Sequence, residues 1–110
     1  MTLTSVQSLR SHLLASALEV LHEQGLDGVT MRAVADRAGV TAPALYWHFA
    51  DKEALIREIG RELSRTFKDR MLEANAAPSS EARLRRTLEA FRTFAVTYPS
   101  YFHMLFVRPP

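Results

Sequence analysis

The sequence predicts an all-α fold, and three observations support this. Apolar residues recur three or four positions apart over most of the 110 residues, which is the period of an amphipathic helix. Glycine, serine, threonine and aspartate stand where that pattern breaks, as they do at helix ends. No segment alternates apolar and polar side chains in the manner of a half-buried strand. We therefore expect helices joined by short turns.

The composition is that of a folded globular chain, with 47% apolar and 24% charged residues. The absence of cysteine excludes disulfides and thiolate metal sites, and it fits a reducing compartment. No segment approaches the roughly 18 consecutive apolar residues of a membrane span, and residues 1–7 lack the basic start of a signal peptide. We expect a cytoplasmic protein that does not associate with membranes. The net charge of +2 does not itself indicate nucleic-acid binding, because such binding depends on cations that touch phosphates.

The first helix is predicted over residues 8–24. Gly25 can end it because glycine tolerates positive φ, and Asp27-Gly28 adds a turn signal just beyond. The apolar side chains of this helix follow the helical period and are expected to form one buried stripe of Leu13, Leu14, Ala17, Leu18 and Leu21.

Two short helices are predicted next, over residues 31–38 and 42–48. Thr30 and Thr41 can cap their amino ends, and Pro43 suits a first helical turn, where a missing N–H is harmless. The side chains expected to face inward are Val34, Ala35 and Ala38 in the first of these helices, with Leu45 and Phe49 at the second.

A long fourth helix is predicted from its cap, Asp51, to about Ala74, because apolar residues recur at every fourth position. Residues 75–80, NAAPSS, are typical of a linker. A fifth amphipathic helix follows, and its apolar face is expected to consist of Leu84, Leu88, Phe91, Ala95 and Tyr98.

Pro99 ends the fifth helix, and a sixth is predicted over residues 100–107. It is apolar on nearly every side, so it must be covered from several directions. The sequence ends at Pro109-Pro110 before supplying those covers, which leaves a fragment, a naturally short protein or a truncated one as open expectations. If the molecule were complete, its exposed apolar side chains would favour aggregation or an unusual dimer. These side chains would be those of Phe102, Leu105 and Phe106.

Residues 34–49, VADRAGVTAPALYWHF, have the pattern of two short helices crossing at a steep angle. Ala35 supplies a small side chain at the crossing, and Gly39 supplies a residue that can adopt positive φ in the turn. This spacing is that of a DNA-binding helix-turn-helix, with residues 42–48 as the recognition helix. A purely structural helical corner would need the same residues, so the corner alone leaves both interpretations open.

The residues around the corner carry a wider likeness. Thr30-x-x-x-Val-Ala-x-x-Ala-Gly-Val-Thr, then Leu45-Tyr-Trp-His-Phe, then Asp51-Lys-x-x-Leu closely resemble the amino-terminal region of the TetR family of bacterial transcriptional regulators, without a gap over roughly residues 9–60. The resemblance implies a three-helix DNA-binding domain over residues 1–56. It also implies that the long fourth helix joins this domain to the start of an all-helical ligand-binding and dimerisation domain over residues 57–110.

The resemblance assigns roles to residues flanking the corner. Thr30 would contact a phosphate through its hydroxyl and the neighbouring backbone N–H groups, although a plain helix cap is the alternative. Arg32 would reach a base edge, with guanine as the commonest partner of a guanidinium, although a solvated surface arginine is the alternative. Lys52 would grip a phosphate at the positive end of the fourth helix.

The leading end of the recognition helix, Thr41, Ala42, Pro43 and Ala44, would enter the major groove. Three of these side chains lack polar atoms, so we expect selectivity to depend on thymine methyl groups, on Arg32 and on DNA shape. The resemblance also implies phosphate contacts from Tyr46 and His48. We expect Trp47 to pack against neighbouring helices at the edge of the DNA-binding surface.

The aromatic residues towards the carboxyl end could line a pocket for a small-molecule effector, or they could form core. The candidate lining residues are Phe91, Tyr98, Tyr101, Phe102 and His103.

The sequence contains no catalytic constellation, no histidine pair with metal-ligand spacing and no phosphate-binding glycine loop. We therefore expect that the protein is not an enzyme and that it has no cofactor and no metal site. The predicted function is sequence-specific transcriptional regulation. We expect a ligand-responsive repressor that binds an inverted-repeat operator in double-stranded DNA as a homodimer. Two alternatives are a DNA-binding protein that acts through a protein partner, and a helical interaction module that binds no DNA.

Overall fold

The computed structural model describes the backbone of residues 2–106 and the side chains of residues 8–104. Over these residues the chain is all-α, as predicted, and contains no strand. Val107, the predicted end of the last helix, lies outside the described residues, and so do the side chains of Leu105 and Phe106.

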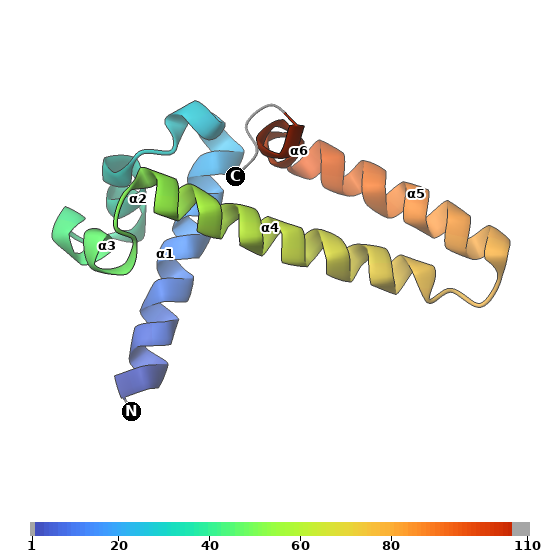
Figure 1. Cartoon of the computed structure of the whole chain (residues 1–110), viewed down its shortest axis with the longest axis horizontal. Helices are drawn as coiled ribbons and strands as arrows, with labels where there is room; N and C mark the ends of the chain where they lie inside the picture. Colours follow the sequence, from blue (N-terminus) through green and yellow to red (C-terminus); the bar gives the residue numbers. More distant parts are fainter. Residues whose placement is uncertain (1, 107–110) are drawn as a thin grey trace. The chain divides into compact units, whose positions relative to one another are not determined.

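Six α-helices and one short 3-10 helix follow one another over residues 2–106 (Figure 1). In order they are α1 (Thr2–Gln24), η1 (Leu26–Gly28), α2 (Met31–Ala38), α3 (Ala42–His48), α4 (Lys52–Asn75), α5 (Ser80–Thr97) and α6 (Pro99–Phe106). The predicted bounds of α2 and α3 are confirmed. Helix α1 begins well before the predicted position near Ser8, because nothing in residues 2–7 breaks a helix even though the apolar stripe begins only at Leu13.

The described chain divides into two compact units, Met1–Ile59 and Gly60–Pro110. The continuous helix α4 contributes its first turns to the first unit and the rest to the second. None of the described helices is long and apolar enough to cross a membrane.

The first unit has a core in which α1 packs against α2 and α2 packs against α3, and side chains of early α4 are buried as well. The predicted stripe of α1 is correct at three positions and wrong at Leu14 and Leu18, which are only half-buried. Val20 and Ser16 are buried instead. The Ser16 hydroxyl donates to the backbone carbonyl of His12 at 2.9 Å, which satisfies a polar group inside the core and explains why serine is tolerated there. The buried side chains of this core include Leu13, Ala17, Val20, Leu21, Val29, Val34, Ala35, Leu45, Phe49, Leu55 and Ile59.

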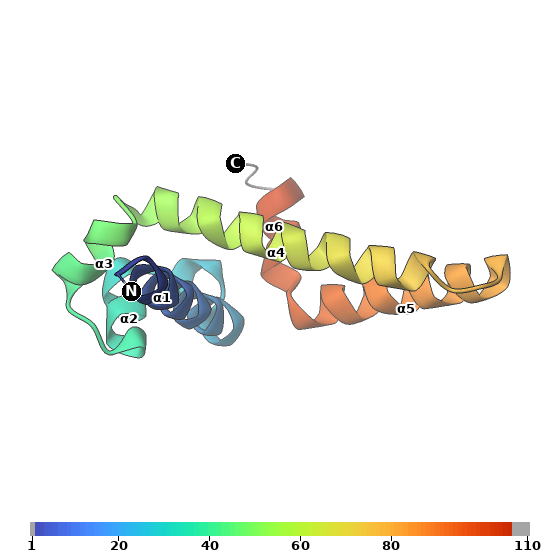
Figure 2. The ribbon, with the colours of Figure 1, turned by 90° about the horizontal axis from the view of Figure 1, so that it is seen from below.

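The second unit is built from the later part of α4 together with α5 and α6. Helix α5 runs back alongside α4 in the opposite direction, as both ribbon views show (Figures 1 and 2). Phe67 of α4 meets Phe94 of α5 edge-on with ring centroids 5.1 Å apart, and it meets Tyr101 of α6 at 6.0 Å. The Tyr101 hydroxyl lies 3.0 Å from that of Ser64, so the buried phenol has a hydrogen-bond partner within this cluster.

Three of the five side chains on the predicted apolar face of α5 are exposed. Leu84 and Leu88 are 64% and 61% exposed, and Phe91 is also exposed, whereas Phe94 is buried. Periodicity shows which side chains share a face of a helix but not which neighbour covers that face. Among the described residues, α4 and α6 cover the side of α5 that carries Phe94.

Candidate nucleic-acid interface

The turn between α2 and α3 is built as the sequence predicts. Gly39 has φ 74° and ψ 30°, which is the left-handed conformation. Its N–H donates to the carbonyl of Asp36, and the N–H of Val40 donates to that of Ala35 at 3.0 Å. These two bonds satisfy carbonyls that a helix end leaves free, so the chain can leave α2 and start α3 within three residues.

The amino ends of α2, α3 and α4 are capped by the predicted side chains. The Thr30 hydroxyl oxygen accepts from the N–H of Ala33 at 3.0 Å, and that of Thr41 accepts from the N–H of Ala44 at 3.3 Å. Asp51 accepts from the N–H of Ala54 at 2.8 Å. Both threonines are exposed and use an oxygen lone pair for the cap, so their hydroxyl protons stay available to an outside acceptor.

A hollow of about 410 Å³ lies between α2 and α3. Four predicted DNA contacts line it: Arg32 from α2 with Thr41, Ala42 and Tyr46 from the other side of the turn. Its remaining lining residues are Met31, Ala35, Asp36 and Val40. The structure thus brings the base-reading candidate Arg32 to one concave surface with Thr41 and Ala42, the first two residues of the leading end. The other predicted contacts do not line the hollow, namely Thr30, Pro43, Ala44, His48 and Lys52.

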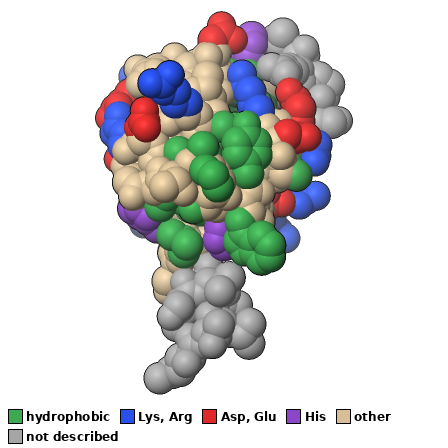
Figure 3. All heavy atoms as spheres, turned by 90° about the vertical axis from the view of Figure 1, so that its left-hand side faces the viewer, with side chains coloured by type: hydrophobic (Ala, Val, Ile, Leu, Met, Phe, Trp, Pro, Cys, Tyr) green, Lys and Arg blue, Asp and Glu red, His purple; other side chains and the backbone are tan. Residues whose placement is uncertain are grey.

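The surface around α3 is apolar at its centre. Figure 3 shows apolar side chains gathered on this face, with basic and acidic side chains towards its margins. Among the predicted contacts, Pro43 and Tyr46 are exposed, whereas Ala44, His48 and Lys52 are half-buried. All nine predicted DNA contacts have accessible surface.

Trp47 departs from its prediction. Its side chain is 83% exposed, so it does not pack against a neighbouring helix in the described part of the chain. Leu45 and Phe49 turn to the core from the opposite side of this seven-residue helix, and no described element covers the side of Trp47. An exposed aromatic pair, Tyr46 and Trp47, therefore stands on the candidate interface.

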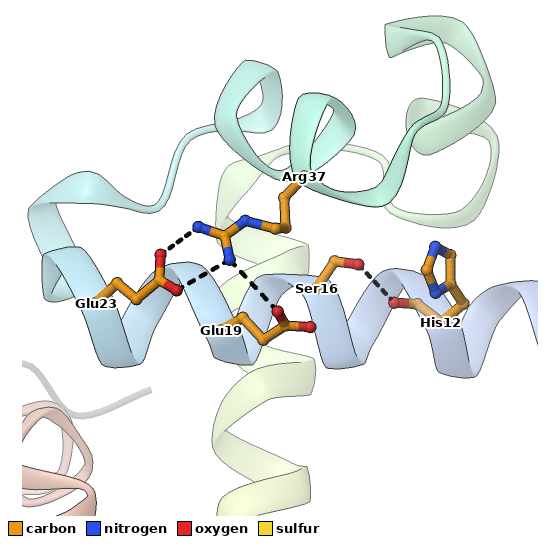
Figure 4. A network of polar contacts seen from close by, with 5 residues as sticks. All are labelled: His12, Ser16, Glu19, Glu23 and Arg37. Atoms are coloured by element: carbon orange, nitrogen blue, oxygen red, sulfur yellow. Dashed lines mark hydrogen bonds and ion pairs between the residues drawn. The ribbon is translucent and has the colours of Figure 1, made fainter.

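Arg37 is not part of this surface although it belongs to the helix-turn-helix. Its guanidinium forms hydrogen bonds with both carboxylate oxygens of Glu23 and lies 3.3 Å from Glu19, so it ties α2 to α1 (Figure 4). Hydrogen bonds and charge attraction with Glu23 raise the pKa of Arg37 above its usual value. The hydrogen bond from Arg37 lowers the pKa of Glu23. This arginine is occupied by carboxylates and is not a candidate for phosphate binding.

Two side chains of α1 reach the helix-turn-helix without any local signal in the sequence. Arg10 donates to the carbonyl of His48, and His12 Nε2 lies 2.9 Å from the carbonyl of Ala38. These pairs are 38 and 26 positions apart in the chain, so only the fold brings them together.

The candidate pocket residues gather as an aromatic cluster. Tyr101 is buried, its ring lies 5.2 Å from that of Phe102, and the Phe102 ring lies 5.3 Å from that of Phe91. Tyr98 joins the cluster through Phe94, whereas His103 is exposed. Because the rings fill the space between one another, these contacts favour core packing, and a role in effector binding stays a prediction.

Comparison with known proteins places these features in a family. Residues 13–59 match the family model "Bacterial regulatory proteins, tetR family". The chain is 36% identical over 89 residues to the tetracycline repressor protein class D of Escherichia coli, a match that covers 81% of this chain and 40% of that protein. It is 52% identical over 44 residues to the class A repressor from transposon 1721 of Escherichia coli, which covers 40% of this chain and 20% of the relative.

A further relative is the HTH-type transcriptional regulator AcrR of Shigella flexneri, with 41% identity over 58 residues, 53% of this chain and 27% of the relative. A solved TetR-family transcriptional regulator of Haemophilus influenzae shares the fold, with a TM-score of 0.63 at 17% identity over 94% of this chain and 57% of that one. The chain spans less than half the length of the tetracycline repressors that it matches. The helix-turn-helix segment, residues 13–59, therefore carries the similarity of this chain to the tetR family of bacterial regulatory proteins.

Proposed function

We propose that the chain binds DNA through the face of α2 and α3 and represses transcription. The observation that carries this proposal is that the Gly39 turn holds Thr41 and Ala42, at the exposed start of α3, on one concave surface with Arg32. A recognition helix must present its amino-terminal residues to the major groove in this way. The names of the relatives, which include tetracycline repressors, support repression as the direction of control.

Base readout is proposed to combine one polar contact with several apolar ones. Arg32 is exposed and lines the hollow, and its guanidinium can donate to the O6 and N7 acceptors of guanine. Ala42, Pro43 and Ala44 offer methyl and methylene groups, which suit the methyl group of thymine. With few hydrogen-bonding side chains at the tip of α3, the shape and deformability of the duplex would carry part of the specificity.

Phosphate contacts are proposed on both sides of the recognition helix. Thr30 and Thr41 retain hydroxyl protons beyond their capping bonds, and Tyr46 and His48 can donate from the phenol and the imidazole. Lys52 stands in the first turn of α4, where the helix end favours an anion. The cap from Asp51 places a carboxylate at the same end, so the ammonium group of Lys52 would supply most of the attraction there.

The further features of the proposal concern the regulatory half. We propose a homodimer that presents two recognition helices about 34 Å apart to an inverted repeat, the spacing of one DNA turn. An unidentified small molecule bound near the aromatic cluster would bind the two states with different affinity and weaken DNA binding. Helix α4, continuous from Lys52 to Asn75, would connect the DNA-binding residues 1–56 with the regulatory residues 57–110. The proposed role is regulatory rather than enzymatic, and its place is the bacterial cytoplasm.

Selection of bound duplexes from a random library, followed by sequencing, tests the proposal. We expect enrichment of one motif, and an inverted repeat of that motif where two chains bind together. Enrichment of a motif together with loss of binding in Arg32→Ala would support direct readout by the α2 and α3 face. A pool that stays random after several rounds would contradict DNA recognition and favour a helical interaction module. If a motif is recovered, comparing partner capture with and without the duplex separates direct repression from action through a protein partner.

A further inference from the structure

The carboxyl ends of both helices in the helix-turn-helix are held by side chains of α1. His12 Nε2 lies 2.9 Å from the carbonyl oxygen of Ala38 at the end of α2, and because a carbonyl can only accept, the imidazole donates. Arg10 Nη1 donates at 3.2 Å to the carbonyl of His48, the last residue of α3. Carbonyls in a last helical turn have no partner within the helix, so these bonds satisfy groups that would otherwise need solvent.

The guanidinium of Arg10 makes two further contacts. Its Nη2 lies 3.3 Å from a carboxylate oxygen of Glu58 in α4. Its central carbon lies 4.6 Å from the centre of the Phe49 ring, which is buried at the end of α3. A planar guanidinium with five donors can hold a carbonyl, a carboxylate and an aromatic face together, and a lysine ammonium cannot reproduce that geometry.

Helix α3 depends on such a contact more than a long helix would. It has seven residues, and among its own side chains only Leu45 is buried. A short helix has few buried contacts to hold its direction, and Phe49, which directly follows α3, is the buried side chain over which Arg10 lies. The positive charge of Arg10 also lies at the negative end of the α3 dipole, where a cation is stabilising.

Building on the proposed function, we propose that Arg10 is a positioning residue for the recognition helix. It fixes the carboxyl end of α3 to α1 and to Glu58 of α4, and it thereby sets the direction in which residues 42–48 meet DNA. Arg10 itself touches no DNA in this account. The ion pair with Glu58 is partly exposed, at 40% and 24% of the two side chains, so its contribution to stability is small and its effect is geometric.

The test uses the full 110-residue chain and four variants. Arg10→Met removes the contacts but keeps an unbranched apolar side chain, Arg10→Lys keeps the charge without the planar group, and Glu58→Gln removes the negative charge of the ion pair. Arg57→Met is the matched control, because Arg57 is an exposed arginine of α4 whose loss changes the net charge equally.

Two measurements are made on each variant. The first is the affinity for the duplex recovered by the selection described above, or for the random duplex pool if none is recovered, at several salt concentrations. The second is the time-resolved fluorescence anisotropy of the free protein, which reports the local motion of α3 because Trp47 is the sole tryptophan and lies on that helix.

We expect Arg10→Met to bind DNA about five- to tenfold more weakly than Arg57→Met, which is the loss expected when the net contribution of one ordinary hydrogen bond is removed from the ordering of a binding surface. The salt dependence of the two variants should be equal, and only Arg10→Met should increase the fast depolarisation of Trp47. Arg10→Lys should be intermediate, and Glu58→Gln should shift both readouts in the same direction by less.

Two results would overturn the inference. A fall in the salt slope by about one unit in Arg10→Met relative to Arg57→Met would make Arg10 a phosphate contact. Unchanged Trp47 depolarisation in Arg10→Met would show that α3 does not depend on Arg10. If Arg10→Met loses helical structure, Arg10→Lys and Glu58→Gln decide by the same criteria. If no variant and no wild-type protein binds DNA, the proposed function fails, whereas the depolarisation still decides whether Arg10 fixes α3.

Discussion

Replacing Gly39 tests whether backbone conformation alone sets the corner between α2 and α3. The residue has φ 74° and ψ 30°, and a Cβ built on it meets no heavy atom within 4 Å beyond its own chain neighbours. Side-chain crowding from the surrounding fold therefore adds little to the cost of a substitution. What remains is the left-handed conformation, which costs an ordinary L-residue about 1–2 kcal/mol and a β-branched one more.

We expect Gly39→Ala to destabilise the protein by about 1 kcal/mol and Gly39→Val by about 2 kcal/mol or more. For a domain of this size, 1 kcal/mol lowers the melting temperature by about 4–8 °C. Gly39→Asn should cost least, because asparagine adopts the left-handed conformation most readily after glycine. Thermal unfolding followed by circular dichroism measures all three variants, and the salt-matched DNA affinity shows whether α3 has moved.

Gly25 provides the matched contrast. Its φ of 76° is nearly the same, but its ψ of −179° places it in a region that is open essentially to glycine alone. Like Gly39, it has open space where a Cβ would lie. Gly25→Asn should therefore cost more than Gly39→Asn. Equal melting temperatures for Gly39→Val and the wild type, or a larger loss for Gly39→Asn than for Gly25→Asn, would refute the assignment of these turns.

Three further outcomes follow from the structure. Lys52→Ala should weaken binding to all duplexes alike. It should also reduce the slope of log affinity against log salt concentration by about one unit in a salt titration, and an unchanged slope would argue against a phosphate contact. Arg37 lowers the pKa of Glu23, so the ionised carboxylate stabilises the fold at pH values above its ordinary pKa of 4.5, and this stabilisation is lost as the pH falls below that value. The melting temperature of Glu23→Gln should therefore lie below that of the wild type at neutral pH and converge with it in acid. A gap that persists in acid would contradict this linkage. Phe94→Ala should lower the free energy of unfolding, measured in urea, by about 3–5 kcal/mol, whereas Leu88→Ala, at a side chain that is 61% exposed, should lower it by less than about 1 kcal/mol. Equal losses of stability in the two variants would contradict the observed packing of α5.

Local signals predicted the helix-turn-helix well. The caps Thr30, Thr41 and Asp51 and the turn glycines act within three or four residues, so the sequence contains everything that their geometry requires. The same holds for the bounds of α2 and α3. The family likeness then extended this local prediction to a fold.

Features that depend on distant neighbours could not be predicted. The inner side of α5 is set by Phe67 and α6 rather than by its own periodicity, which is why Phe94 and not Leu88 is buried. The exposure of Trp47 depends on the absence of a covering element on one side of α3 among the described residues. The contact from Arg10 to the end of α3 spans 38 positions and leaves no pattern in either segment.

The roles of the nine candidate DNA contacts follow neither from local sequence signals nor from contacts within the chain, because these roles concern binding to a second molecule, the DNA duplex. The candidate contacts differ in whether they line the hollow between α2 and α3. Arg32 and Tyr46 line one hollow, whereas Lys52 lies apart from it on the next helix. Direct observation of the contact surface is therefore the decisive step.

Titration of the 15N-labelled chain with the selected duplex, followed by backbone amide chemical shifts, provides that observation. The largest shifts should fall on Thr30, on Arg32, on residues 41–48 other than Pro43, which has no amide proton, and on Lys52. A duplex of scrambled sequence should produce smaller shifts. Shifts that concentrate on α5 and α6, or the absence of any shift at saturating duplex, would contradict DNA recognition by the α2 and α3 face.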